Sequence, residues 1–211
     1  SSNYENTTND IENNVSFLSN VDFGRYGLFG QAARVFADDK LTLSLGLRLD
    51  GDSFTAGGDN PFNNFSPRIS LSYDVSDKWT VNGSAGVYYK IPPMTILGYQ
   101  NNLGELVNQT SKYIRSDHYV LGLEYLPRNS TRFTLEGFYT QLNDAFYLFP
   151  LGQDEFGERF EKRNGSGAVV QGITIEGRAN LDYIFEVEAG FTLQSSMFND
   201  ARETIEGLPA I

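Results

Sequence analysis

Residues Lys40 to Asp50 read K-L-T-L-S-L-G-L-R-L-D, and this stretch decides the fold. Leucine occupies every second position from 41 to 49, with polar residues or glycine between. Successive side chains of an extended strand point to opposite faces, so this strand has one aliphatic face and one polar face. An α-helix would scatter the same leucines around its axis. The stretch therefore predicts a strand that separates an apolar environment from a polar one.

The composition narrows the classes of function. The 211 residues carry a formal net charge of −11, which argues against nucleic-acid binding because such proteins need a basic surface. No cysteine is present, so the sequence predicts neither disulfides nor thiolate metal sites. No run of about 18 apolar residues exists, so we expect no transmembrane helix. Residues 1–20 are polar, and we expect no signal peptide in them.

Seven other stretches show weaker forms of the same alternation. Short segments rich in glycine, asparagine, aspartate and serine separate them, as expected for strands and turns. The eight expected strands are Tyr26–Phe36, Lys40–Asp50, Ser66–Val75, Trp79–Ile91, His118–Leu126, Arg132–Gln141, Val169–Arg178 and Tyr183–Gln194.

The connections between these strands alternate in length. Four are short and predict tight antiparallel hairpins: Ala37–Asp39, Ser76–Lys78, Pro127–Thr131 and Ala179–Asp182. Three are long: Gly51–Phe65, Pro92–Asp117 and Leu142–Ala168. Short turns at one end and long loops at the other are typical of outer-membrane β-barrels. We therefore expect an all-β, antiparallel up-and-down meander over residues 24–200, with a loop or disordered lead-in at 1–23 and a loop at 201–211.

Aromatic residues mark both ends of the apolar faces. Trp79, Phe133 and Tyr183 lie beside the short turns, and Tyr89, Tyr119 and Tyr139 lie near the long loops. Ten residues of strand span roughly 33 Å. Tilted by about 40°, that length covers roughly 25 Å, the height of the apolar band of a membrane barrel. We interpret the apolar side as facing lipid, where Arg34, near a turn, would reach the interface.

Two other architectures fit the alternation. A soluble β-sandwich that serves as a binding or adhesion domain also alternates apolar and polar residues. Three features favour the barrel: short turns at one end and long loops at the other, aromatic residues at both ends of the apolar faces, and apolar faces that carry no charge. A complete eight-stranded barrel is the other alternative, but the mostly small polar residues of the inner faces would underfill a barrel of that size.

Several hairpins resemble those of TonB-dependent outer-membrane transporters. Three stretches carry the resemblance: F-G-Q-A-A-R-V-F-A-D-D-K-L-T-L-S-L-G-L-R-L-D (Phe29 to Asp50), N-F-S-P-R-I-S-L-S-Y-D-V-S-D-K-W-T-V-N-G-S-A-G-V-Y-Y-K-I-P-P (Asn64 to Pro93), and H-Y-V-L-G-L-E-Y (His118 to Tyr125) followed by F-T-L-E-G-F-Y-T. The closest resemblance is to Bacteroidetes-type members. R-N-G-S-G-A-V-V-Q-G-I-T-I-E-G (Arg163 to Gly177) and E-A-G-F-T-L-Q-S-S-M-F (Glu188 to Phe198) resemble the branch called vitamin B12 receptors.

The resemblance implies a 22-stranded barrel in the outer membrane of a Gram-negative bacterium. It also implies an N-terminal plug inside the barrel, energised by TonB, and no enzymatic activity. We expect this chain to form part of the C-terminal half of such a barrel, without a plug, a TonB box or the last strands. The implied partners are outer-membrane lipid, the plug, TonB through the plug, and a surface lipoprotein. The implied cargo is a scarce large nutrient, either a corrinoid such as cobalamin or an iron chelate.

Two groups of residues are candidates for the function, and no cofactor is expected. Charged residues on the polar faces would line the lumen and contact the plug: Arg48, Arg68, Lys90, Glu124, Glu136, Glu176, Arg178, Glu186 and Glu188. Aromatic and amide residues of the long loops would contact substrate: Tyr99, Gln100, Asn101, Asn102, Phe146, Tyr147 and Phe149. A hydrated wall without specific contacts, and simple packing of the loops, are the alternatives.

Metal-binding and catalytic motifs are weak. Asp50-Gly51-Asp52 and Asp59-Asn60 lack the spacing of an EF-hand loop, so no metal site is expected, although a calcium site built from several loops stays an alternative. His118 is the single histidine, and Ser116-Asp117-His118 are neighbours in sequence, whereas triad members meet in space. An outer-membrane hydrolase that uses His118 is therefore the third hypothesis, after the transporter and the soluble binding domain.

Overall fold

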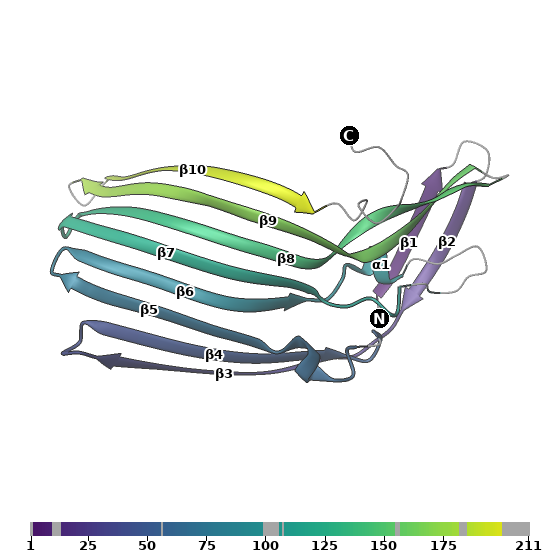
Figure 1. Ribbon diagram of the computed structural model, residues 1–211, viewed down its shortest axis with the longest axis horizontal. Helices are drawn as coiled ribbons and strands as arrows, with labels where there is room; N and C mark the ends of the chain where they lie inside the picture. Colours follow the sequence, from purple (N-terminus) through teal and green to yellow (C-terminus); the bar gives the residue numbers. More distant parts are fainter. Residues whose placement is uncertain are drawn as a thin grey trace.

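A computed structural model of the chain describes the backbone of residues 2–9, 14–55, 57–98, 106, 108–154, 157–181 and 185–199. Side chains are described for residues 22–55, 57–94, 96–98, 106, 108–145, 167–180 and 186–197. Eight strands form one sheet (Figure 1). They are β3 (Arg25–Phe36), β4 (Leu41–Asp52), β5 (Ser66–Ser76), β6 (Trp79–Lys90), β7 (Ile114–Arg128), β8 (Thr131–Asp154), β9 (Gly157–Leu181) and β10 (Phe185–Asn199).

The strands follow one another across the sheet in chain order, from β3 to β10. Each neighbouring pair is antiparallel. The expected all-β, up-and-down meander is therefore confirmed. Both outer edges, on β3 and β10, lack a partner strand among the described residues. An open edge presents a row of unpaired backbone groups, so this sheet has room for a further strand on each side.

The short turns lie at one end of the sheet and the long connections at the other (Figure 1). In the turn between β3 and β4, Ala37, Asp38 and Asp39 adopt left-handed φ angles of 57°, 51° and 66°. Aspartate tolerates this conformation better than most residues, because its short polar side chain can bond locally. The β5–β6 and β7–β8 turns contain only residues 77–78 and 129–130 between the paired strands. The β9–β10 turn lies outside the described residues.

Four strands extend at least four residues beyond a predicted end, and β10 is one of them because it continues to Asn199 rather than Gln194. β7 begins at Ile114 rather than His118. β8 continues past Gln141 to Asp154, and β9 begins at Gly157 rather than at Val169. The connection Leu142–Ala168 is therefore a paired hairpin extension and not a long loop. The lead-in at 1–23 also differs from the expected loop, because β1 (Ser2–Asn9) pairs with β2 (Asn14–Val21). The expected loop at 201–211 lies outside the described residues.

One face of the sheet is apolar on every strand. Directly paired residues lie on the same face, and the row through Leu45 runs Ala32, Leu45, Ile69, Ala85, Tyr119, Tyr139, Gln171 and Ser195. Arg34 lies on this face opposite Leu43, two residues before the end of β3. Its guanidinium lies 5.2 Å from the centre of the Phe36 ring. The alternation leaves the facing of this strand ambiguous, and the register places Leu28, Ala32 and Arg34 on the apolar face.

No second layer covers this apolar face in the described part of the chain. Leu45, Leu121 and Phe191 are 49%, 66% and 64% exposed. The accessible surface of the chain is 15021 Å². A compact protein of the same mass exposes about 9,800 Å². Within the described residues the eight-stranded sheet is therefore a single layer, and the alternative of a β-sandwich is wrong.

The register gives the tilt of the strands. In the row above, Leu45 is four residues from the first residue of β4, whereas Ser195 is ten residues from the first residue of β10. From each strand to the next, the paired position therefore moves about one residue further from the short-turn end of the sheet. With a rise of about 3.3 Å per residue and a strand spacing of about 4.8 Å, this stagger corresponds to a tilt of about 35°. Membrane barrels have strand tilts of about 35–45°.

Helical structure is confined to the long connections. The helix α1 (Met94–Leu97) and the 3₁₀ turn η1 (Pro61–Asn64) are each four residues long. Asn60 caps η1 by accepting a hydrogen bond from the Phe62 N–H, at 3.1 Å. Within the described ranges, no helix has the length and apolar character needed to cross a membrane.

Candidate functional site

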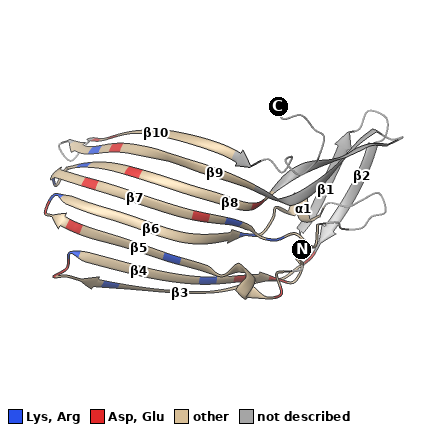
Figure 2. Ribbon diagram, viewed as in Figure 1, with Lys and Arg blue, Asp and Glu red and all other residues tan. Residues whose placement is uncertain are grey.

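The second face of the sheet is polar and carries the predicted lumen residues. Because alternate residues share a face, Arg48, Arg68 and Lys90 lie on the side opposite the leucines, and so do the predicted residues of β7 to β10. Figure 2 shows the charges as isolated bands separated by long uncharged stretches of strand. The structure therefore places these predicted residues on one wall, and their contacts differ from strand to strand.

The polar face of β7 to β10 is a charged wall. Arg132 lies between Glu124 and Glu176, at 3.8 Å from each carboxylate. Arg178 forms an ion pair with Glu186. Glu136 and Glu188 have no cationic partner among the described residues. This half of the wall therefore carries more carboxylates than cations.

The polar face of β4 to β6 is largely neutral, and its cations lie toward the long connections. Arg48 donates two hydrogen bonds to Asp50, at 2.6 and 2.8 Å, so this pair is internally neutralised. The Arg68 guanidinium lies 4.2 Å from the centre of the Tyr88 ring, a cation–π contact. Neither Arg68 nor Lys90 has a carboxylate partner among the described residues. These two side chains present positive charge at this end of the wall.

A serine–histidine pair lies beside Tyr88. Ser116 Oγ and His118 Nε2 are 2.6 Å apart, because residues two apart on a strand share a face. The His118 ring lies 4.8 Å from the ring of Tyr88. Asp117 points to the opposite face, where it accepts a hydrogen bond from Arg115 at 2.9 Å. The Ser-Asp-His sequence therefore does not form a triad.

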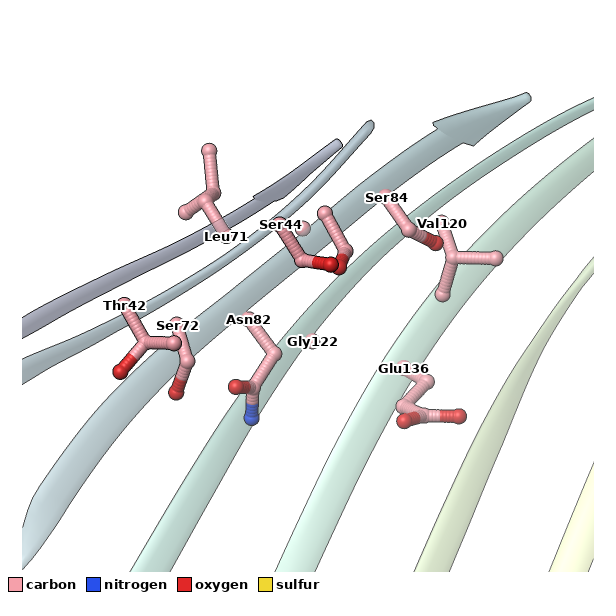
Figure 3. Close-up of a pocket in the computed structure, with 11 residues that line it drawn as sticks. Thr42, Ser44, Leu71, Ser72, Asn82, Ser84, Val120, Gly122 and Glu136 are labelled. Carbon is pink, nitrogen blue, oxygen red and sulfur yellow. The ribbon is translucent and has the colours of Figure 1, made fainter. Parts of the chain in front are cut away.

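Two hollows lie side by side on the polar face, mainly on β4 to β6. The first extends to Val120 and Gly122 of β7 and Glu136 of β8, and the second extends to residues 29–31 of β3. The first has a volume of about 270 Å³, and Figure 3 shows Thr42, Ser72 and Asn82 projecting to its side of the sheet and Leu71 projecting to the other. The second, of about 260 Å³, lies toward the long connections beside Arg48, Arg68 and Tyr88. The two hollows share three lining residues: Ser44, Ser70 and Ser84. They therefore form one continuous groove along the strands.

The long connections pack into a small core of their own. Leu97 is fully buried, and Ile91 and Tyr113 are nearly so. Phe23 and Phe54 contact this cluster, and their rings lie 5.7 Å apart. These residues come from three different segments, before β3, after β4 and around α1. The described parts of the connections thus form a packed cap at one end of the sheet.

Asp52 connects the segments of this cap through hydrogen bonds. It lies beyond Leu49, the last leucine of the apolar face, and is fully buried. Its Oδ1 accepts hydrogen bonds from the N–H groups of Phe54 and Thr55, and its Oδ2 accepts from the hydroxyls of Thr55 and Tyr113, at 2.7–2.9 Å. Burial opposes ionisation of Asp52, but these hydrogen bonds outweigh it and lower its pKa. Burial and the bond to Asp52 raise the pKa of Tyr113.

Two of the three acidic residues considered for calcium, Asp50 and Asp52, have other partners. Asp50 binds Arg48, and both oxygens of Asp52 accept hydrogen bonds from the cap. Within the described residues no group of three or more histidine, cysteine, aspartate or glutamate side chains could hold a metal ion.

Of the residues predicted to contact substrate, some lie outside the described residues, and for the others only the backbone is described. Tyr99, Gln100, Asn101 and Asn102 lie outside the described residues. Phe146, Tyr147 and Phe149 lie on β8, where their backbones pair with Asn164, Arg163 and Glu161 of β9. They therefore belong to the hairpin extension and not to a loop. The sequence analysis considered Asp52 only as a calcium ligand and did not single out Tyr88 or Tyr113, although D-S-F-T at Asp52 is a recognisable local hydrogen-bonding pattern.

Strand tilt, an uncovered apolar face and an opposing polar wall together define a section of a transmembrane β-barrel. Residues 1–210 match the model of the family described as TonB dependent receptor-like, beta-barrel. The chain belongs to this family of transporters and receptors, whose relatives are outer-membrane proteins of Gram-negative bacteria.

Solved structures share the fold at low sequence identity. The siderophore receptor PirA from Pseudomonas aeruginosa is 18% identical with a TM-score of 0.66, covering 87% of this chain and 35% of that chain. The copper transporter OprC is 20% identical with a TM-score of 0.60, covering 82% and 29%. The outer membrane transporter YddB from Escherichia coli is 15% identical with a TM-score of 0.65, covering 88% and 26%.

The chain thus spans about a third or less of these structures. No curated protein matches the sequence.

Proposed function

We propose that this chain is part of the barrel wall of a TonB-dependent receptor in the outer membrane of a Gram-negative bacterium. The observation that carries the proposal is the register, which places apolar residues on one face of all eight strands and leaves that face uncovered. The apolar face meets lipid, and the polar face lines the lumen. The full barrel has 22 strands, and further strands pair with the open edges of β3 and β10.

The charged wall of β7 to β10 is the docking surface for the plug. In the part of the chain that the structure describes, Glu136 and Glu188 lack cationic partners, so basic side chains from another segment would be favourable there. Glu124, Arg132, Glu176, Arg178 and Glu186 pair among themselves and would rearrange when TonB pulls on the plug. No residue of the wall performs bond chemistry, and the protein is a transporter and not an enzyme.

The long connections form the capture side for a scarce, large nutrient. The packed cap around Leu97 and Asp52 supplies a rigid base for this surface. Tyr99, Gln100, Asn101 and Asn102 follow α1, and Phe146, Tyr147 and Phe149 lie on the hairpin extension. We assign these residues to substrate contact. The cargo is a corrinoid such as cobalamin or an iron chelate, as in a Bacteroidetes-type receptor served by a surface lipoprotein.

Uptake by the host organism tests this function. Cells that lack the full-length gene should lose uptake of radiolabelled cyanocobalamin or of a ferric chelate by at least tenfold. Removal of TonB should cause the same loss, and the complementing gene should restore uptake. If uptake of both classes stays normal in the deletion strain, the substrate assignment is wrong. Uptake that is lost in the deletion strain but persists without TonB would overturn the energy coupling.

The Ser116–His118 pair favours hydrolysis as a second candidate. Its 2.6 Å contact is the geometry of a nucleophile and its base. However, no described carboxylate contacts His118 to orient its ring. Hydrolysis of nitrophenyl esters by the full-length protein, abolished in both Ser116→Ala and His118→Ala, would establish this candidate. We expect no such activity.

A further inference from the structure

The polar wall is divided into two unlike halves along the boundary between β6 and β7. On β4 to β6 the side chains in the middle of the wall are small and uncharged. On β7 to β10 they include five glutamates, two arginines and the Phe138 ring. Six residue pairs of the polar face cross the boundary, among them Thr80 with Glu124, Asn82 with Gly122, and Ser84 with Val120.

The two larger hollows lie mainly on the neutral half, whereas a smaller hollow of about 160 Å³ lies on the charged half beside Glu124, Arg132 and Glu176. The groove defined by the two hollows runs from Thr42, one residue after the start of β4, to Arg48 near its far end. Six residues of strand cover roughly 20 Å, which at a tilt of about 35° spans roughly 16 Å, about two thirds of the height of a barrel's apolar band. Glu136 is the only carboxylate along the described groove, and it stands at the border with the charged half. The groove therefore connects the two ends of the wall.

The side chains along the groove are free to bind a moving solute. Thr42, Ser70 and Ser84 make no side-chain hydrogen bond with the described residues. Hydroxyl groups donate and accept, so they exchange partners with water and solute at little cost. Ion pairs resist such exchange, because separating one partner leaves a charge uncompensated. The charged half is thus suited to stable binding of a partner. The neutral half is suited to weak, rapidly exchanged contacts with a solute that moves along it.

Resting on the proposed transport function, we propose that the solute passage opens between the plug and the groove on β4 to β6, while the plug stays docked on β7 to β10. The loop end of the groove is cationic, because Arg68 lines it and has no carboxylate partner among the described residues. The passage therefore takes a hydrophilic solute and admits anionic groups more readily than cationic ones.

Cysteine accessibility in the full-length receptor in living cells tests the passage. The 211 residues contain no cysteine, so each introduced thiol is unique in this part of the wall. Ser70→Cys and Ser84→Cys place a thiol in the groove by a conservative change. Thr134→Cys and Thr192→Cys are the matched controls on the polar faces of β8 and β10. The probes are the anionic sulfonatoethyl and the cationic trimethylammonioethyl methanethiosulfonates.

We expect active TonB to raise the modification rate at Ser70→Cys and Ser84→Cys by about tenfold, and at the controls by less than twofold. The anionic probe should react about threefold faster than the cationic probe at Ser84→Cys, and Arg68→Gln should remove that preference. A TonB-dependent rise at the controls, or an equal rise on both halves, overturns the passage. A faster cationic probe overturns its charge selectivity. Modification rates that do not change with active TonB at any of the four positions would instead overturn the proposed function itself.

Discussion

At the scale of single residues, Asp52 is the central connection of the cap. It joins the segment after β4 to Tyr113, a residue 61 positions further along the chain. The hydrogen bonds from the Phe54 and Thr55 N–H groups could be predicted from the sequence D-S-F-T. Aspartate commonly accepts hydrogen bonds from backbone N–H groups two or three residues later in the chain. The contact with Tyr113 could not, because no local pattern specifies which distant hydroxyl reaches the second oxygen.

Removing the Tyr113 hydroxyl should loosen the cap. A hydrogen bond to a charged group contributes about 1.5–3 kcal/mol. Tyr113→Phe should therefore lower the protection of the Phe54 and Thr55 amides by about tenfold or more in hydrogen exchange. Tyr119→Phe is the control, because its ring lies on the apolar face beside Tyr139. Equal loss of protection in both variants would show that the cap does not depend on the Asp52 contact.

The cap should also depend on pH through Asp52. Its pKa is lowered in the folded protein, so its stabilising contribution is complete above the ordinary aspartate value of about 3.9. The contribution is lost as the pH falls through the lowered folded value, where the carboxylate is protonated. Protection factors of the Phe54 and Thr55 amides should be constant from pH 8 to 5 and fall in acid. In Asp52→Asn this fall should vanish; if it persists, another group controls the cap.

Gly172 and Gly30 form a matched pair for testing the packing of the wall. A Cβ at Gly172 would overlap the Leu193 carbonyl oxygen and lie 2.8 Å from the Phe138 ring, whereas at Gly30 nothing lies within 4 Å. Gly172→Ala should therefore lower the free energy of unfolding by about 1–3 kcal/mol, the usual cost of overpacking. Gly30→Ala should change it by less than about 0.5 kcal/mol. Urea unfolding of the full-length barrel in lipid vesicles measures both, and equal effects would contradict this packing.

At the scale of elements, the alternation located the strands well where they cross the apolar band. It failed beyond that band, where β8 and β9 pair as far as Asp154 and Gly157. A hairpin that is hydrated on both sides needs no period-2 pattern. Register shifts between Leu142 and Ala145, near the left-handed Asp144, break what pattern there is. The sequence therefore indicated the hairpins but not the full length of this one.

The two faces of β4 should respond differently to charge. An arginine at mid-bilayer on the lipid face of a barrel costs about 2–4 kcal/mol, whereas a hydrated lumen position tolerates it. Leu45→Arg should lower the folding free energy into vesicles by that amount, and Ser44→Arg, its neighbour on the polar face, by less than about 1 kcal/mol. Equal costs at the two positions would contradict the assignment of the faces.

At the scale of the whole molecule, the sequence predicted the meander, the two faces and the family. The aromatic belts are confirmed where side chains are described: Trp79 pairs with Tyr125 and Tyr125 with Phe133, with the first two rings stacked at 4.3 Å, and Tyr119 pairs with Tyr139. Tyr183 lies outside the described residues. The groove could not be predicted, because it depends on which small residues meet across neighbouring strands.

The facing of the apolar side is the claim on which the account depends, and spin labels in the full-length receptor in lipid bilayers measure it most directly. Labels at Leu45 and Leu121 should contact oxygen, which dissolves in lipid, and avoid a water-soluble nickel chelate. Labels at the adjacent Ser44 and Val120 should avoid lipid and contact the nickel chelate wherever the lumen is hydrated. If labels at Leu45 and Leu121 are shielded from both reagents, another layer of protein covers this face and the membrane barrel is wrong.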